Sequence, residues 1–306
     1  MENIYLLSGI LIIDKPAGWT SHDVVAKLRG VLKIKRIGHG GTLDPMATGV
    51  LPVFVGRATR AAEFCENADK EYIAGLRLGV VTDTQDITGN IQSENEVTVT
   101  LDDVKAILPL FTGKQEQIPP MYSAVKKDGW KLYELARLGK DIPRKPRDIT
   151  VFSMEVLEVP EIQDPETPNT YILRIKCSKG TYIRTLCHDI GAALGCGGTL
   201  ASLQRIRAGD YSIEMAHSLD DVISMVFSDS VNNIILPVDS IFSGYPSIYI
   251  SRTEERKAKN GAVCQTGKDT GDGTYRVYGQ SGEFLLLGDV SGNKIKTIKS
   301  FFDIGG

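Results

Sequence analysis

The sequence predicts a mixed α/β fold of the α+β kind, followed by a smaller β-rich module. Residues 9–33 and 171–195 each run from an apolar strand through a short turn into an amphipathic helix. The remaining strands do not alternate with helices as in a regular parallel βαβ series. The last sixty residues contain short apolar runs between Gly-rich turns. We therefore expect a large domain over residues 1–240 and a small one over 247–306.

The first half of the chain supports this prediction element by element. A helix is expected after the Pro-Gly turn, with Thr20 or Ser21 as its cap. Residues 71–89 alternate like a strand that leads into a polar turn, and residues 101–111 have the spacing of a short amphipathic helix. The apolar face of the first helix is expected to consist of Val24, Val25, Leu28 and Leu32.

The second half continues the pattern. Residues 129–139 predict a second short helix, and residues 208–246 are acidic and are expected to be helical. Strands are expected at residues 274–279, 283–290 and 294–302. The helix after the turn at Gly180-Thr181 has four apolar residues at helical spacing: Ile183, Leu186, Ile190 and Leu194.

Composition indicates a folded protein. Charged residues make up 24% of the 306 and the AVILMFWYC set 42%, as in ordinary globular proteins. Residues 4–13 are the most apolar early stretch, but they are too short for a bilayer and lack a basic flank, so a buried strand is expected. The cysteines are odd in number and form no CxxC pair, which favours a reducing cytoplasm. They are Cys65, Cys177, Cys187, Cys196 and Cys264.

Charge is segregated along the chain. The net charge of −3 argues against a uniformly basic nucleic-acid binder. Residues 122–147 nevertheless hold eight Lys and Arg against three Asp and Glu, and residues 174–207 hold six against one. Residues 208–251 contain no Lys or Arg. The two basic stretches are available for phosphate groups, although each could also be an ordinary solvated face.

Residues 38–53, GHGGTLDPMATGVLPV, carry a single carboxylate, Asp44, among four glycines. Glycines allow tight turns and the close approach of a bulky ligand. Asp44 could equally be a turn residue that caps a backbone amide. The stretch lacks the Walker pattern. No metal site is expected, because the histidines, at positions 22, 39, 188 and 217, form no ligand pair.

The whole string resembles the catalytic loop of the bacterial tRNA pseudouridine synthases of the TruB family, G-H-x-G-[Thr or Ala]-L-D-P-x-A-T-G-x-L-P. Other family motifs recur in order across residues 10–207: DKPAGWTSHDVV, KEYIAGLRLGVVTDTQDITG, PPMYSAVKKDGWKLYELAR and CSKGTYIRTLCHDIG. Gly40 stands where the family usually has Thr, which we expect to loosen the loop slightly without changing the chemistry.

The resemblance implies roles for the central residues. Asp44 would be the catalytic carboxylate, Tyr72 would lie against the target base, and Arg184 would pair with Asp44 through a bidentate fork. His39 would stack inside the RNA loop once the base has left. Without the resemblance, Tyr72 could be a half-buried strand residue and His39 a turn residue.

Further positions follow from the same likeness. Lys15 and Leu203 would support and line the pocket, and Tyr182 would contact RNA. Residues 122–147 correspond to the RNA-clamping insertion of the family and mix positive charge with Trp130 and Tyr133. We expect this insertion to grip the tRNA backbone through Lys126, Lys127 and Lys131.

The family likeness also implies a fold and an activity. It implies the pseudouridine synthase fold, with a mixed, mostly antiparallel central sheet flanked by helices and a small C-terminal PUA-like β-barrel. The implied activity is isomerisation of the T-loop uridine of tRNA, position 55, without a cofactor, obligate protein partner or membrane, by a monomer. The alternatives are a guide-RNA-dependent pseudouridine synthase and a non-catalytic RNA-binding or chaperone protein on the same fold.

Overall fold

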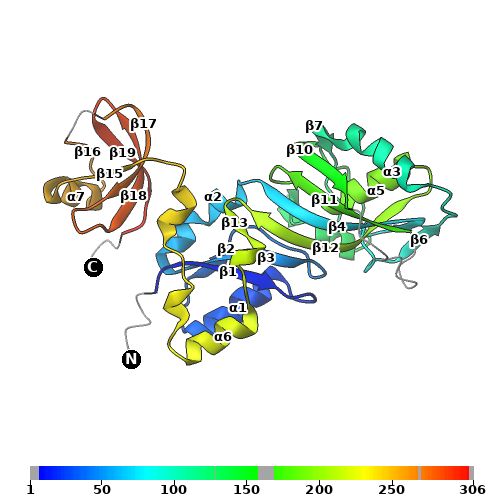
Figure 1. The fold of residues 1–306 in the computed structure, drawn as a ribbon, viewed down its shortest axis with the longest axis horizontal. Helices are drawn as coiled ribbons and strands as arrows, with labels where there is room; N and C mark the ends of the chain where they lie inside the picture. The colour runs from blue at the N-terminus through cyan, green and yellow to red at the C-terminus, as the bar shows by residue number, and fades with distance from the viewer. Residues whose placement is uncertain (1–6, 128, 158–168, 268–269, 303–306) are drawn as a thin grey trace.

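The computed structural model describes residues 7–127, 129–157, 169–267 and 270–302. Its centre is a ten-stranded sheet (Figure 1). The strands are β1 (Gly9–Lys15), β2 (Ile37–His39), β3 (Thr48–Val55), β4 (Lys70–Leu78), β7 (Gly113–Gln117), β10 (Arg147–Val156), β11 (Thr170–Cys177), β12 (Gly198–Ala208), β13 (Tyr211–Ser212) and β14 (His217–Ser218).

The strand order confirms the predicted mixed, mostly antiparallel sheet. The order is β14-β1-β3-β12-β4-β11-β10-β7, with β2 paired to β3 and β13 to β12. Only the pairs β1/β14 and β3/β12 are parallel among the described strands of this sheet. Strands from the beginning and the end of the large domain therefore meet at its middle, where β3 lies beside β12.

Seven α-helices form in the described residues, and two groups of them cover the ten-stranded sheet. They are α1 (Ser21–Leu32), α2 (Ala62–Glu66), α3 (Leu101–Ile107), α4 (Leu132–Arg137), α5 (Ile183–Ala193), α6 (Leu219–Phe227) and α7 (Arg252–Lys259). Helices α1 and α6 share one buried apolar cluster with β1 and β3, whereas α5 shares another with β4, β11 and β12. In Figure 1 the two groups lie toward opposite ends of the long sheet.

Helix α1 forms as predicted. Thr20 is its cap: the hydroxyl accepts a hydrogen bond from the backbone N–H of Asp23, and the Asp23 carboxylate accepts from the N–H of Thr20. Ser21, the alternative cap, is instead buried and free to contact another segment. The four residues of the predicted apolar face, Val24, Val25, Leu28 and Leu32, are all buried.

The expectation of a helical segment over residues 208–246 was largely wrong. Helix α6 is its one α-helix, and 3₁₀ turns form at Ile213–Met215, Val231–Asn233 and Val238–Phe242. The backbone of Leu236 pairs with Ile10 through hydrogen bonds of 2.8 and 2.9 Å. This pairing with the start of β1, followed at once by a proline, holds the chain extended where a helix was expected.

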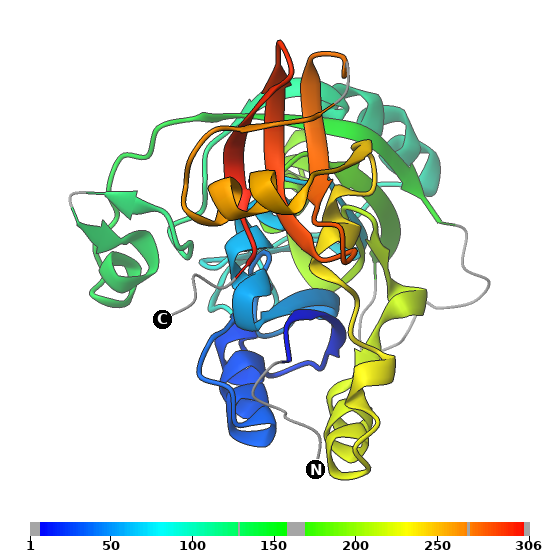
Figure 2. The same cartoon turned by 90° about the vertical axis from the view of Figure 1, so that its left-hand side faces the viewer.

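The C-terminal segment forms the predicted β-rich module, a curled five-stranded half-barrel of the PUA-like kind. Its order is β15-β17-β18-β19-β16. Figure 2 shows this sheet and α7 in front of the main domain. The strands are β15 (Ser247–Tyr249), β16 (Cys264–Gln265), β17 (Gly273–Tyr278), β18 (Phe284–Ser291) and β19 (Lys294–Ser300).

Aromatic rings join the module to the main domain. Phe242 stacks edge-on against Phe64 with centroids 4.9 Å apart, and it contacts Phe301 at 5.6 Å. Arg60, in the 3₁₀ turn before α2, donates a hydrogen bond of 3.1 Å to the carbonyl of Ser300. The segment that leads into α2 is thus packed against the C-terminal module.

Three remaining predictions concern the early strand, the cysteines and membranes. Strand β1 begins at Gly9, and residues 4–6 of the predicted strand lie outside the described residues. All five cysteines are buried free thiols. Among the described residues, no helix combines the length and the apolar character that crossing a membrane requires.

Candidate active site

The loop between β2 and β3 carries Asp44 and is fixed on both sides of it. The Ser21 hydroxyl receives a hydrogen bond of 2.9 Å from the N–H of Leu43 and donates one of 3.2 Å to its carbonyl. The carbonyl of Pro45 accepts from the N–H of Gly18 at 2.8 Å and from the Lys15 ammonium at 3.3 Å. The backbone at Asp44 is therefore held by α1 and by the turn before it.

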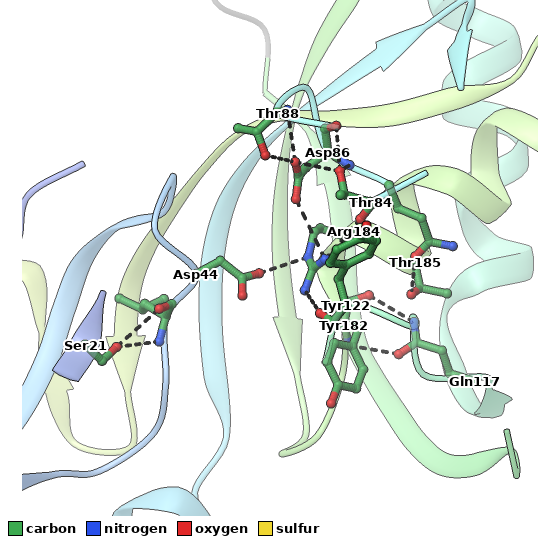
Figure 3. Close-up of polar contacts among 12 residues, drawn as sticks. Ser21, Asp44, Thr84, Asp86, Thr88, Gln117, Tyr122, Tyr182, Arg184 and Thr185 are labelled. Atoms are coloured by element: carbon green, nitrogen blue, oxygen red, sulfur yellow. Dashed lines mark hydrogen bonds and ion pairs between the residues drawn. The ribbon is translucent and has the colours of Figure 1, made fainter. Parts of the chain in front are cut away.

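The structure brings Arg184 against Asp44, with 2.9 Å between Nε and Oδ2 (Figure 3). The predicted bidentate fork does not form. The Nη1 and Nη2 groups instead donate hydrogen bonds to the carbonyls of Thr84, at 3.0 Å, and Tyr122, at 2.8 Å. The Arg184 side chain is 5% exposed, so its charge is held in a fixed, nearly dry setting, whereas the Asp44 side chain is 38% exposed.

A second carboxylate, Asp86, completes the site and was missed by the sequence reasoning. Its Oδ2 lies 3.7 Å from Nη1 of Arg184. Its Oδ1 accepts hydrogen bonds from the hydroxyls of Thr84, at 2.9 Å, and Thr88, at 2.5 Å, and from the N–H of Thr88, at 3.0 Å. The sequence signal for it is an aspartate between two threonines in the predicted polar turn.

The surroundings set the ionisation of Asp44. Burial raises the pKa of its carboxyl group above the ordinary value, and the charge of Asp86 adds to this rise. The Arg184 guanidinium opposes the rise, and the Lys15 ammonium does so more weakly. The ion pair with Arg184 therefore favours the ionised form of the Asp44 carboxyl group, which burial disfavours.

Tyr72 lies in β4 with only 8% of its surface exposed, in the same buried apolar cluster as Leu43 and Leu203. Burial raises the pKa of its phenol to about 12, so the ring stays neutral at physiological pH. Leu203, in β12, is also 8% exposed. These two side chains form an apolar wall beside Leu43 of the loop, and the role of Leu203 in lining the pocket stays a prediction.

His39 and Tyr182 lie at the ends of two elements. His39 ends β2 and is half-buried, and its Nδ1 has no hydrogen-bond partner among the described residues. Burial and the neighbouring His22 lower the pKa of its imidazole, which favours the neutral ring. Tyr182 precedes α5, and its N–H and carbonyl are both bonded to the side-chain amide of Gln117, at 2.8 and 3.0 Å.

Lys15 acts as a support inside the protein. Its side chain has no exposed surface, and its ammonium donates to the carbonyls of Pro16, at 2.9 Å, and Trp19, at 2.6 Å, besides Pro45. Burial lowers its pKa to about 8, an effect that the charge of Asp44 opposes. Its contact with Pro45 places it beside the Asp44 loop, and its role as a support of the pocket stays a prediction.

Gly40 occupies a crowded position. A Cβ atom there would lie 2.7 Å from the Cβ of Cys65 and 2.7 Å from the ring of Phe54. The space that the usual threonine side chain needs is filled by the side chain of Cys65, from α2. The packing around Gly40 is therefore close, and whether the glycine loosens the loop stays a prediction.

Arg205 is a further residue that the sequence reasoning missed. It lies in β12, is 1% exposed, and donates hydrogen bonds to the carbonyls of Gly41, Thr42 and Val50. Its sequence signal is a cation in the second half of a strand, two residues after Leu203.

The basic insertion forms a separate hairpin of β8 (Lys126–Lys127) and β9 (Trp130–Lys131), followed by α4. Figure 2 shows it, in green, away from the main body. The Trp130 side chain is 57% exposed, and Lys126 and Lys127 are also exposed. The Lys131 ammonium lies 5.4 Å from the ring centroid of Tyr133. Helix α4 is shorter than the predicted 129–139.

Two family models match this chain. Residues 29–183 match the TruB family pseudouridylate synthase N-terminal domain, and residues 184–243 match the tRNA pseudouridylate synthase B C-terminal domain. The C-terminal module lies beyond both matches.

Curated relatives and solved structures agree with this assignment. The chain is 41% identical to tRNA pseudouridine synthase B of Clostridium kluyveri, over 96% of this chain and 100% of the relative. It is 44% identical to the protein of that name from Syntrophomonas wolfei, over 95% and 96%. A chain in a structure titled as a Cbf5-Nop10-Gar1 complex superposes with a TM-score of 0.72 and 27% identity, over 96% of this chain and 85% of that one. The chain therefore belongs to the TruB family of pseudouridylate synthases.

Proposed function

We propose that this chain isomerises uridine to pseudouridine in tRNA, at position 55 of the T-loop. The observation that carries the proposal is the Asp44–Arg184 ion pair, with 2.9 Å between Nε and Oδ2, in a loop fixed by the surrounding backbone. The relatives named tRNA pseudouridine synthase B support tRNA as the substrate. The family motif around Asp44 supports the position.

The reaction breaks the bond between N1 of uracil and the sugar carbon C1′, turns the base, and joins its C5 atom to C1′. The proton on C5 leaves to solvent and N1 gains one, so the isomerisation balances without an external reductant, oxidant or group donor. Departure of the base leaves an electron-poor sugar carbon, as in glycoside cleavage. Asp44 is the carboxylate that traps or stabilises the electron-poor intermediate, by attack on the sugar or on the base.

The neighbouring residues assist this carboxylate. Arg184 keeps Asp44 ionised and aimed, since its charge opposes the rise in pKa that burial causes. Tyr72 lies against the flipped base and, with Leu203, keeps bulk water from the reacting sugar. His39, whose neutral form is favoured, stacks in the RNA loop in place of the departed base.

Binding of tRNA relies on surfaces around the pocket. The hairpin lysines contact the RNA backbone, namely the exposed Lys126 and Lys127 and the partly buried Lys131, and Tyr182 also contacts the RNA. Positive charge gathered in one insertion makes binding sensitive to salt although the whole chain is acidic. We propose that the protein acts as a monomer, without a cofactor or an obligate protein partner.

Two alternative functions use the same fold: a guide-RNA-dependent pseudouridine synthase and a non-catalytic RNA-binding protein. The structural neighbour whose title names Nop10 and Gar1 is 27% identical, whereas the relatives named tRNA pseudouridine synthase B are 41% and 44% identical. This difference favours direct action on tRNA over dependence on a guide RNA. A non-catalytic RNA-binding protein would not need the buried cations that hold the Asp44 loop and its carboxylate.

The test uses purified protein and unmodified tRNA transcript, with pseudouridine mapped at each uridine. We expect modification of position 55 alone, and also of a minimal T-arm hairpin, because single-stranded loops are recognised by shape and by stacking of exposed bases. The Asp44→Asn variant serves as the matched control. Modification elsewhere would refute the position, and a need for added guide RNA or partner proteins would refute direct action.

A further inference from the structure

Arg205 is among the largest fully buried side chains in the described part of the protein. Its guanidinium donates hydrogen bonds to three backbone carbonyls: Nε to Val50 at 2.7 Å, Nη2 to Gly41 at 3.1 Å and Nη1 to Thr42 at 3.4 Å. Gly41 and Thr42 precede Asp44 in the chain, and Val50 follows it. One side chain therefore ties the part of the loop before the carboxylate to strand β3, which follows it.

The backbone is shaped to admit this contact. Strand β12 runs parallel to β3 with Arg205 opposite Gly49. Gly49 has a φ of +95°, and a Cβ atom there would lie 2.3 Å from the carbonyl oxygen of Arg205. No other residue type fits both the conformation and the distance, so β12 approaches β3 at Gly49 more closely than an ordinary strand could.

Stability alone does not account for a cation in this place. No ion pair joins Arg205 to a carboxylate within the described ranges 7–127, 129–157, 169–267 and 270–302. Burying a charge with only neutral partners is costly, and apolar replacements of buried ionic groups are often as stable. What an apolar side chain cannot provide is a planar fork of donors that spans the two ends of a loop.

Strand β12 pairs with β3 along one edge and with β4 along the other. The register partner of Arg205 in β4 is Tyr72, and Leu203 lies two residues before Arg205 in β12. The same strand thus carries the apolar wall and the clamp, while Arg184 approaches Asp44 from α5. Movement of β12 relative to the loop would change the distance between Asp44 and the wall against which the base rests.

We propose that Arg205 is a positioning residue for the pseudouridine synthase reaction: it sets the place of Asp44 relative to Arg184 and Tyr72 by clamping residues 41, 42 and 50 to β12. This inference rests on the proposed function. Arg205 does not contact the reacting atoms in this scheme. It acts through the backbone of the loop, and its loss leaves the surfaces that bind tRNA intact.

The kinetic test compares Arg205→Lys and Arg205→Met with wild type in single-turnover reactions at saturating protein. A misplacement of a reacting group by about 1 Å can lower the rate by about 10²-fold, and we expect a fall of about this size for Arg205→Met. Arg205→Lys should lower the rate less, by at least about 10-fold. The lysine keeps the charge but cannot reach the carbonyls of both segments at once. The dissociation constant for tRNA should change less than about twofold, because phosphate contacts elsewhere dominate affinity.

Arg60→Lys is the matched control. Arg60 also donates to a backbone carbonyl, that of Ser300, and joins two segments far apart in the chain, but it does not contact the Asp44 loop. Its loss should lower the thermal midpoint without lowering the single-turnover rate. Wild-type rates in both folded Arg205 variants would overturn the proposal, as would a rate loss that only follows the unfolded fraction or lies only in tRNA affinity.

A second measurement does not depend on activity. The carboxyl group of Asp44 can be titrated by ¹³C NMR, with Asp44→Asn to assign its signal. Arg184 from α5, Asp86 from the turn after β5 (Val80–Thr82) and Lys15 from β1 face this group. If Arg205→Met moves Asp44 away from Arg184, its titration shifts to higher pH, and an unchanged titration would overturn the clamp. Should wild type modify no tRNA, the proposed function fails, and this titration still decides the role of Arg205.

Discussion

The Asp44 pocket and the basic hairpin both concentrate positive charge, but they hold it in opposite ways. In the pocket, Arg184 and Arg205 are almost fully buried and are fixed by backbone carbonyls. In the hairpin, Lys126 and Lys127 are exposed. Fixed cations can orient one carboxylate, whereas exposed lysines offer charge to a flexible polyanion. Changes in the pocket should therefore act on the chemical step, and changes in the hairpin on affinity and its salt dependence.

The largest expected effect is that of Asp44→Asn, which keeps the size of the side chain and removes its charge. If the carboxylate reacts, the single-turnover rate should fall by at least about 10³-fold, because a neutral amide neither traps nor stabilises the intermediate. Tritium release from tRNA labelled at C5 of uridine measures this step. A folded variant that binds tRNA and releases tritium at the wild-type rate would reduce Asp44 to a turn residue.

The next effect is that of Arg184→Lys. A lysine ammonium cannot serve Asp44 and the carbonyls of Thr84 and Tyr122 from the fixed positions of a guanidinium. We expect the single-turnover rate to fall by about 10²-fold at saturating protein, with little change in tRNA affinity. Turnover close to that of wild type would show that the charge alone matters and that its geometry does not.

Removing the positive charges of the hairpin should lower tRNA affinity and leave the rate of the chemical step unchanged, the reverse of the effects expected at Asp44 and Arg184. Replacing Lys126, Lys127 and Lys131 by Gln removes up to three phosphate contacts, so the slope of log affinity against log salt should flatten by about 2. The single-turnover rate at saturating protein should be unchanged. Filter binding over a range of salt concentrations measures the slope.

The control for that experiment is the same substitution at three exposed lysines outside the hairpin, Lys27, Lys33 and Lys35, in and after α1. They give an equal change in net charge away from the hairpin. Equal slopes in the two triple variants would mean that net charge, and not the insertion, governs binding.

A smaller effect is expected from Gly40→Thr, which restores the usual family residue. The added atoms overlap Cys65 and Phe54, and overpacking of this kind costs about 1–3 kcal/mol. Urea unfolding measures the loss. The double variant with Cys65→Ala has room for the threonine and should recover part of the stability. A single variant as stable as wild type would show that the neighbours of Gly40 move aside easily.

The smallest effect concerns pH. In the proposed mechanism Asp44 reacts as the ionised carboxylate. Because burial raises the pKa of this group, the rate should be lost as pH falls through a value above that of an ordinary aspartate. The Lys15 charge opposes this rise, so Lys15→Met should move the acid limb to higher pH. Single-turnover rates across the acid range test this, and a limb that moves to lower pH would contradict the electrostatic argument.

Local patterns predicted much of this structure. Thr20 capping α1 and the strand-turn-helix that leads to Arg184 depend on neighbours in sequence, and the family likeness supplied the pairing of Arg184 with Asp44. Contacts between distant segments were not predictable in the same way. The hydrogen bond from Arg205 to Val50 joins residues 155 positions apart, and the pairing of Leu236 with Ile10 overrode a helical expectation. Both depend on the sheet order, which single-sequence patterns do not specify.

The contacts of Arg184 make three parts of the chain interdependent. One guanidinium faces the Asp44 carboxylate, the turn at Thr84 and the carbonyl of Tyr122, the first residue of the basic insertion. Deleting residues 122–147 to study RNA binding would therefore also remove a hydrogen-bond acceptor from a buried cation beside Asp44. Loss of activity in such a truncated protein would not measure the contribution of the hairpin to docking. Side-chain substitutions at the tip of the hairpin keep the hydrogen bond between Arg184 and Tyr122. They therefore separate the effect of the hairpin on RNA binding from its effect on the Asp44 site.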